Sequence, residues 1–369
     1  MKKCFQVVAV ILSICLILTA CAPAGEDVGS NGNTADSQKV ENLEKLCKVW
    51  GYTKYNHPAF LLGKKDWDEE LLKLIPVVSE AKDDEVNDIL HEWFVSLGEI
   101  DYGSSRPGSK PIESEAIVQA DTGWIEDKAY LGEELSMDMQ KLGPVSKIDR
   151  SRAPVKFSTG QGIPNFKMEK TDAACSYQTE EERLLGLFRV WNAIEYYFPY
   201  LDIMDKSWHD LLREFIPKIL QASDLQSFEL TIYELTAHLH DGHTIMINGQ
   251  TLHNAFGKYL APVNMLRTKE GQWVVSDLFW DCPLQAGDVI LKLDGTDIEE
   301  IEENRKKYIS VPNDEKLLNR LGIYLLRSQD EEMEITVLRE GKEQTYTVKG
   351  TTQYKYFARS IETSHEILD

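Results

Sequence analysis

An internal repeat with a period of 141 residues constrains the fold more than any other feature of the sequence. Residues 46–76 align without a gap over residues 187–217, and ten of the 31 aligned positions are identical. The identical pairs include Trp50 with Trp191, Tyr55 with Tyr196, Pro58 with Pro199, Trp67 with Trp208, Leu71 with Leu212 and Pro76 with Pro217. The chain therefore holds two copies of one structural unit, and the period is too long for a solenoid.

Each copy reads as a small bundle of three helices. A first helix leads into a turn interrupted by proline, and a second helix begins near the second tryptophan. Apolar residues at helical spacing over residues 85–98 and 225–240 predict a third helix in each copy. The aromatic residues could form a ligand-binding box, but rings at this spacing more often build the core of a bundle. The predicted units span residues 41–110 and 179–250.

Two other segments favour β structure. The connector over residues 111–178 is rich in glycine, proline and serine and contains alternating runs such as EAIVQA and APVKFS, so we expect irregular β structure there. From about residue 255 strands alternate with Lys-Glu-Gly and Asp-Gly turns, followed by helical stretches and a closing hairpin. We therefore expect an α+β multidomain fold, in which the two helical units precede a β-rich domain over residues 255–350 and a tail over residues 351–369.

The N-terminus carries a targeting pattern. Lys2 and Lys3 precede an apolar run of 16 residues, which is shorter than the roughly 20 residues of a membrane-spanning helix. The run ends in LTAC, and small residues before Cys21 resemble the lipobox of bacterial lipoproteins. The resemblance implies a signal peptide over residues 1–20, lipidation of Cys21, and attachment to the extracytoplasmic side of a bacterial cell membrane. The alternative is an ordinary signal peptide, or a buried helix with an incidental cysteine. Residues 21–40 are predicted to form a flexible tether.

Charge and cysteine content exclude other classes. Lys and Arg number 40 against 61 Asp and Glu, which gives a net charge of −21. A nucleic-acid-binding protein needs a basic face, so this balance argues against nucleic acid as a partner. Cys47, Cys175 and Cys282 lie beyond the anchor and are too few for a disulfide framework, so we expect isolated buried or free thiols.

Candidate catalytic groups are few. The sequence contains no G-x-S-x-G nucleophile elbow. The one Ser-x-x-Lys match, Ser79 with Lys82, stands beside two aspartates in a polar stretch, where a lysine would not be desolvated enough to act as a base. We therefore assign this match to chance and expect no peptidase nucleophile in these 369 residues.

The densest group of reactive side chains is the sequence HLHDGH at residues 238–243. Zinc favours imidazole ligands, so His240, Asp241 and His243 form an alternative metal or general-base site. The spacing matches no established metal motif, and we favour the end of a helix followed by an Asp-Gly turn.

The order of these units resembles one family. Each helical unit has a tryptophan, an HP or FP turn and a second tryptophan. The DGHT element at residues 241–244 follows, and then a domain with AGDVI and Asp-Gly signatures. This order is similar to the front half of C-terminal processing (tail-specific, tricorn-core-like) serine peptidases. The resemblance covers about residues 41–350 and implies that residues 255–350 form a PDZ domain. In that family a serine activated by a lysine lies in a later catalytic domain, for which we find no counterpart in residues 351–369.

PDZ domains bind chain ends by adding the peptide as an extra strand, while backbone amides hold its carboxylate. The resemblance places the carboxylate loop and its strand at Gly257, Tyr259, Leu260 and Ala261, and the groove side of a helix at Leu317 and Leu321. The loop lacks the full glycine-hydrophobic pattern of that family, and the two leucines could equally belong to the core.

The sequence thus predicts a membrane-anchored lipoprotein that binds peptide or protein C-termini through a PDZ-like groove, cleaves nothing and needs no cofactor. One alternative is a hydrolase of the peptidase family, with its catalytic half on a separate peptidase subunit or a metal at His240, Asp241 and His243. The other is a structural scaffold with a vestigial groove.

Overall fold

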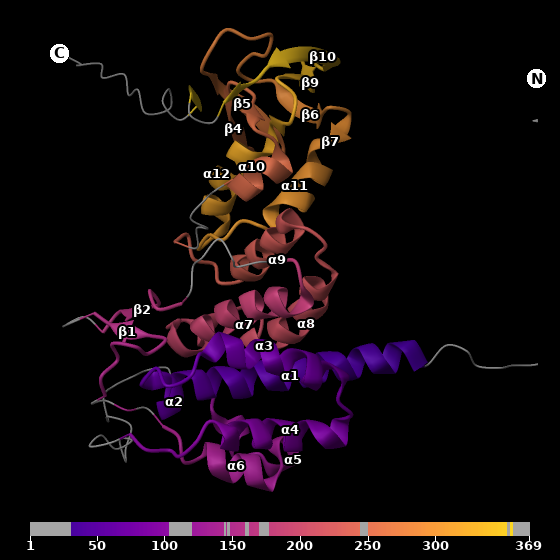
Figure 1. Ribbon diagram of the computed structural model, residues 1–369. Coiled ribbons are helices and arrows are strands. Elements are labelled where there is room, and N and C mark those ends of the chain that lie inside the picture. Colours follow the sequence, from indigo (N-terminus) through magenta and orange to yellow (C-terminus); the bar gives the residue numbers. More distant parts are fainter. Residues whose placement is uncertain are drawn as a thin grey trace, which may run out of the picture. The chain divides into compact units, whose positions relative to one another are not determined.

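The computed structural model describes residues 31–102, 120–143, 145, 148–158, 162–169, 177–243, 250–352 and 355–356. The predicted signal peptide and Cys21 lie outside these residues. The features described below belong to the compact unit Lys39–Asp369. The fold is mixed α+β as predicted, with a helical part followed along the chain by a β-rich part (Figure 1). No helix in the described part of the chain is long and apolar enough to cross a membrane.

The two sequence copies have matching helices. The first copy contains α1 (Asn31–Asn56), α2 (Pro58–Leu61), α3 (Trp67–Glu80) and α4 (Asp83–Ser96). The second contains α7 (Glu180–Tyr197), η2 (Leu201–Ile203), α8 (Trp208–Gln221) and α9 (Leu225–Ala237). Adding 141 to the bounds of α3 gives those of α8, and the last residues of α1 and α4 map onto those of α7 and α9. The repeat in the sequence is therefore a repeat of structure. Helix α1 begins at Asn31, inside the segment expected to be a flexible tether, so helical structure starts earlier than predicted.

Polar caps and tryptophans fix the second helix of each copy. The Asp66 carboxylate accepts from two N–H groups of α3, at 3.0 and 3.1 Å, and the Ser207 hydroxyl accepts from one N–H of α8 at 3.4 Å. The indole N–H of Trp50 donates to the Trp67 carbonyl at 2.8 Å, and that of Trp191 donates to the Trp208 carbonyl at 2.9 Å. The repeated tryptophan pairs thus tie the first helix of each copy to the second.

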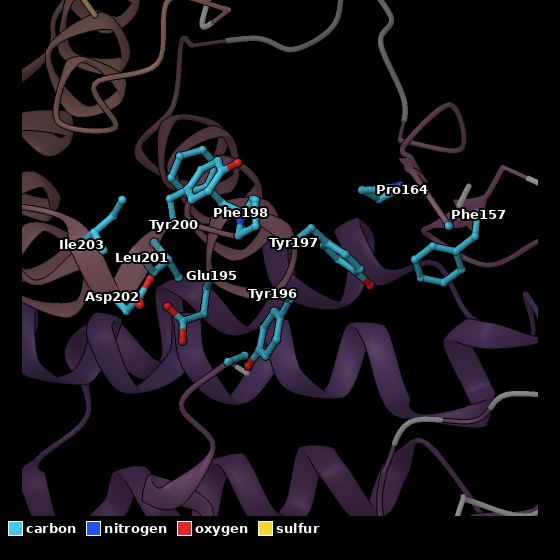
Figure 2. Close-up of a pocket in the computed structure, with 13 residues that line it drawn as sticks. Phe157, Pro164, Glu195, Tyr196, Tyr197, Phe198, Tyr200, Leu201, Asp202 and Ile203 are labelled. Carbon is cyan, nitrogen blue, oxygen red and sulfur yellow. The ribbon is translucent and has the colours of Figure 1, made fainter. Parts of the chain in front are cut away.

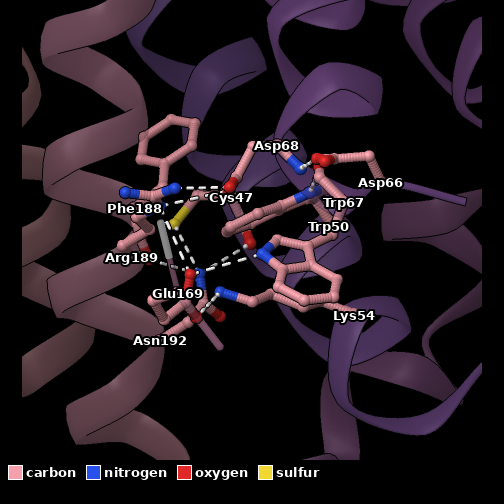
Figure 3. Close-up of polar contacts among 10 residues, drawn as sticks. All are labelled: Cys47, Trp50, Lys54, Asp66, Trp67, Asp68, Glu169, Phe188, Arg189 and Asn192. Carbon is pink, nitrogen blue, oxygen red and sulfur yellow. Dashed lines mark hydrogen bonds and ion pairs between the residues drawn. The ribbon is translucent and has the colours of Figure 1, made fainter. Parts of the chain in front are cut away.

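Helices α1 and α7 cross at equivalent residues of the two copies. Gly51 and Asn192 are 141 residues apart, and a Cβ on Gly51 would lie 1.6 Å from Oδ1 of Asn192. The Asn192 amide donates to the carbonyl groups of a second equivalent pair, Cys47 at 3.1 Å and Phe188 at 2.9 Å (Figure 3). Contact between equivalent residues is the mark of an isologous pairing, so the copies are related by an approximate two-fold axis.

A charged cluster lies beside this crossing (Figure 3). The fully buried Lys54 of α1 pairs with Glu169, and its Nζ lies 4.7 Å from the ring centroid of Trp50. Arg189 of α7 pairs with Asp68 and lies 3.4 Å from Glu169. Burial lowers the pKa of Lys54, while the Glu169 carboxylate acts in the opposite direction. Because Lys54 is sealed from solvent, we interpret the cluster as a structural link between the copies.

The connector differs from its prediction. Its β structure within the described residues is one short antiparallel hairpin, β1 (Lys156–Phe157) and β2 (Pro164–Asn165). Residues 120–143 instead form η1 (Gly123–Ile125), α5 (Lys128–Leu131) and α6 (Glu133–Met139), so the expectation of irregular β structure is wrong there. The physical reason is apolar burial: Leu135 and Met139 lie about one turn apart on α6, and they and Leu131 at the end of α5 are buried in the same core as α4.

The β-rich domain has a core of its own. Its main antiparallel sheet has the order β10-β9-β6-β5-β4, with β7 paired to β6, and a smaller sheet has the order β11-β3-β8. The strands are β3 (Tyr259–Leu260), β4 (Val263–Arg267), β5 (Trp273–Leu278), β6 (Val289–Leu293), β7 (Thr296–Asp297), β8 (Arg327–Ser328), β9 (Glu332–Arg339), β10 (Lys342–Lys349) and β11 (Thr351–Thr352). The helices are α10 (Gln250–Phe256), which precedes the strands, α11 (Ile298–Lys306) and α12 (Asp314–Leu325).

Candidate functional site

The loop expected to hold a peptide carboxylate is already engaged within the protein. The Gly257 N–H donates to the His253 carbonyl at 2.9 Å, and the Ala261 N–H donates to the Leu326 carbonyl at 3.0 Å. Tyr259 and Leu260 form β3, which is the middle strand between β8 and β11 and has no free edge. The geometry therefore assigns these residues to the architecture of the domain, with two of the expected amide donors already used.

The two leucines expected to line a groove pack into the domain core. Leu321 is fully buried in the domain core, and Leu317 is partly buried against the same core. The residue of α12 that approaches the edge strand β4 is Gly322, where a Cβ would lie 3.5 Å from the Met265 carbonyl oxygen. The helix thus lies close against β4, although Leu266 on that strand remains 50% exposed.

The histidine-rich segment does not gather its side chains into one group. His240 has a φ of 50° and its Nε2 lies 3.3 Å from Oδ2 of Asp205, whereas Nδ1 of His243 lies 2.8 Å from Oδ1 of Asp241. The backbone N–H of His243 also donates to Asp241 and lowers the pKa of that carboxyl. Within the residues that the structure describes, no group of three or more His, Cys, Asp or Glu side chains is placed to hold a metal ion.

The Ser-x-x-Lys match has no catalytic geometry. Ser79 lies in the last turn of α3, and the mostly exposed Lys82 has its Nζ 3.5 Å from Oε1 of Glu85. A lysine that activates a serine needs a desolvated site, and the exposed position of Lys82 beside a carboxylate does not provide one.

The turn after α7 borders a cavity that the sequence did not predict (Figure 2). Its volume is about 610 Å³, and it is lined by residues 195–203, by the β1–β2 hairpin at Phe157, Gly162 and Pro164, and by Ala120. Cavities of this size with aromatic walls are typical of ligand sites. A second cavity of about 600 Å³ shares Phe198, Tyr200 and Ile203 with the first and is also lined by residues 239–241, His243 and residues 312–314.

Aromatic rings line the first cavity from end to end. The Tyr197 ring lies 6.0 Å from that of Phe157, and the rings of Phe198 and Tyr200 lie 5.6 Å apart at the other end (Figure 2). Burial raises the pKa of Tyr197, so its phenol stays neutral and can donate or accept a hydrogen bond. Glu195 adds a buried carboxylate whose Oε1 lies 3.3 Å from Nε2 of His209. This lining can bind an apolar or aromatic group and orient it through a few polar contacts.

No protein-family model and no curated protein sequence matches the chain. Solved structures of CPAF, a chlamydial serine protease, show a weak resemblance. Mature CPAF complexed with lactacystin is 12% identical over 50% of this chain and 39% of its own, with a TM-score of 0.33. A CPAF mutant is 12% identical over 46% of this chain and 34% of its own, with a TM-score of 0.34. The chain spans less than two fifths of the length of these CPAF chains.

The corresponding turn of the first copy is closed. His57, Pro58, Ala59, Phe60 and Leu61 are all buried there. In the second copy Tyr200 is 57% exposed and Ile203 is 72% exposed. The sequence did contain a signal for this difference, because YNHPA in the first copy becomes YYFPY in the second. Aromatic residues gained in one copy of a repeat, at a turn and not on a helix stripe, point to a surface with a separate role.

Proposed function

We propose that this protein is a lipid-anchored extracytoplasmic binding protein that holds polypeptide segments and does not cleave them. The observation that carries the proposal is the aromatic cavity at the turn of the second copy, which is open where the turn of the first copy is closed. Under this proposal Cys21 carries the anchor.

The lining of the cavity suits a polypeptide. Rings such as Tyr197 and Tyr200 offer large contact areas with little conformational entropy to lose, and phenol groups can pair with a peptide backbone. The sequence resemblance to C-terminal processing peptidases favours a peptide over a small metabolite. Cleavage would need a nucleophile, and Lys82 is too well solvated to activate Ser79. A separate catalytic peptidase subunit is the partner that would supply this chemistry.

A second candidate site is the edge of β4, where a chain end could add as an extra strand. Leu266, half exposed on this edge strand, favours it, whereas the close approach of Gly322 disfavours it. Binding there should depend on a free peptide C-terminus and should be lost when that carboxylate is amidated.

The test uses the full chain and an unfolded protein substrate, with and without a chelator. We expect saturable binding and no new peptide termini by mass spectrometry after several hours. Replacing Tyr200 with the residue of the first copy, Tyr200→Ala, should weaken binding about tenfold, as expected for loss of one aromatic anchor. Val77→Ala, at a position 53% exposed on α3, is the matched control and should leave binding unchanged. Absence of binding would contradict the proposal, and so would cleavage, whether or not the chelator abolishes it.

A further inference from the structure

The turn of the first copy shows what can cover such a surface, because the chain's own connector lies on it. Val145 and Ala153 pack with Leu61 and Tyr102 in one buried cluster. The connector follows the turn closely, since a Cβ on Gly63 would lie only 2.6 Å from Cβ of Arg152. The cover is therefore an irregular segment that contributes small aliphatic side chains and the stem of an arginine.

Among the residues that the structure describes, none covers the equivalent positions of the second copy in this way. Tyr102 corresponds to His243, whose side chain is 97% exposed, and Leu62 corresponds to Ile203, which is 72% exposed. Ala59, which is buried, corresponds to the exposed Tyr200. Tyr200 and Ile203 line both cavities, so the uncovered surface runs continuously over the turn.

The charge of this surface also differs from that of the first copy. Leu61 is replaced by Asp202, Lys64 by Asp205 and Ile100 by Asp241, whereas Glu99 is replaced by His240 and Asp101 by Gly242. Over these five positions the formal charge changes from 1 − 2 = −1 in the first copy to −3 in the second, with histidine neutral. Asp202 and Asp205 are exposed, and Oδ2 of Asp205 lies 3.3 Å from Nε2 of His240. An occupant of the second copy should therefore carry more positive charge than a cover for the first copy would need.

We infer that the polypeptide bound by this protein is an extended basic segment with small aliphatic residues, which lies over the turn of the second copy as the connector lies over that of the first. This inference rests on the proposed binding function and names its ligand class. Tyr200 and Ile203 contact the aliphatic side chains, and an arginine or lysine of the ligand lies among Asp202, Asp205 and Asp241.

A synthetic peptide with the sequence of residues 142–155, acetylated and amidated, is the probe. It carries three Lys or Arg and one Asp, so its net charge is 3 − 1 = +2. The comparison peptide replaces Arg150 and Arg152 with glutamate, which gives 1 − 3 = −2. Binding to the full chain is measured by fluorescence anisotropy at low salt. We expect the basic peptide to bind about tenfold more tightly than the acidic one.

Three protein variants locate the site. Ile203→Ser removes the aliphatic contact without adding charge and should weaken binding of the basic peptide about tenfold, whereas Val77→Ser, at an exposed position on α3, should leave its affinity unchanged. Asp205→Lys introduces the lysine that the first copy has at this position. It should weaken binding of the basic peptide and strengthen binding of the acidic one. This charge exchange is independent of folding defects, because a misfolded protein would lose both ligands.

The outcomes separate this inference from the proposed function. Equal binding of both peptides, or an affinity for the basic peptide that Ile203→Ser leaves unchanged, would overturn the inference. If only peptides with a free C-terminus bind, the inference is overturned while polypeptide binding stands, with its site at the edge of β4. If no peptide and no unfolded protein binds, both are overturned.

Discussion

Gly51 is the residue on which the association of the two copies most depends. Its missing side chain leaves room for Asn192, whose amide holds two carbonyl groups across the helix crossing. Gly51→Ala should lower the free energy of unfolding by about 2–3 kcal/mol, because the added Cβ overlaps a buried and hydrogen-bonded side chain. Urea unfolding measures the change.

The double variant Gly51→Ala with Asn192→Ala provides the control for this overlap. It should recover at least half of the loss, since the clashing amide is then absent. Gly242→Ala, where the nearest atom to the new Cβ is 4.0 Å away, should change stability little. A Gly51→Ala protein as stable as the parent would contradict the described crossing.

His57 makes stability depend on pH. Burial, with Lys64 and Lys65 nearby, lowers the pKa of its imidazole to about 4, and its Nδ1 accepts from the Ala59 N–H at 3.0 Å. The unfolded chain binds this proton below about pH 6.5 and the folded chain only near pH 4, so the free energy of unfolding should fall as pH drops between these values. The loss is on the order of 2–3 kcal/mol.

Urea unfolding at pH 7.5 and pH 4.5 tests this effect against His57→Asn. Asparagine keeps an acceptor at the N-cap of α2 but does not titrate. The stability difference between the two pH values should therefore be smaller in the variant. An identical difference in both proteins would show that other groups account for the pH dependence.

At the scale of elements, Gly257 fixes how β3 meets β8. Its φ is 115°, and a Cβ would lie 2.3 to 2.6 Å from backbone atoms of Ser328. Gly257→Ala should destabilise the β-rich domain by about 3 kcal/mol and speed hydrogen exchange in β3 and β8. Gly287 has a similar φ of 95°, but open space surrounds it. Gly287→Ala should therefore lower the free energy of unfolding by only about 1 kcal/mol. Equal effects of the two substitutions would mean that backbone strain alone matters at Gly257.

The sequence predicted the helical elements well because their signals are local. Asp66 and Ser207 precede Trp67 and Trp208 as caps, and the structure begins α3 and α8 at those tryptophans. The helices of the connector were not predicted, because the Gly, Pro and Ser residues elsewhere in that segment favoured irregular structure. The helical signal rested on only three apolar residues, Leu131, Leu135 and Met139.

The site was harder to predict because it depends on contacts between distant segments. The sequence around β3 does not indicate that this strand lies between β8 and β11. These two strands are at least 67 and 91 residues away along the chain. The exposed turn at Tyr200 likewise depends on a distant segment, because Val145 and Ala153 of the connector pack on the turn of the first copy, whereas Tyr200 remains 57% exposed.

At the scale of the whole molecule, net charge makes the proposed lipid anchor testable. A chain with a charge of −21 is repelled by anionic lipid headgroups, so its attachment should depend on acylation of Cys21. We expect the parent protein to stay in the membrane fraction through a high-salt wash, and Cys21→Ala to move to the soluble fraction. Retention of the variant on membranes would show that another feature anchors the chain.

The unlike residues at the crossing of α1 and α7 also limit which halves can associate. Two asparagines at this point would overlap, and two glycines would leave the carbonyl groups of Cys47 and Phe188 without the amide that now bridges them. Two second copies therefore cannot pair with each other in this way. If two molecules exchanged halves, each first copy would have to be replaced by another first copy. The duplicated halves are therefore not interchangeable, and a symmetric pairing of two identical copies would require a change at this position.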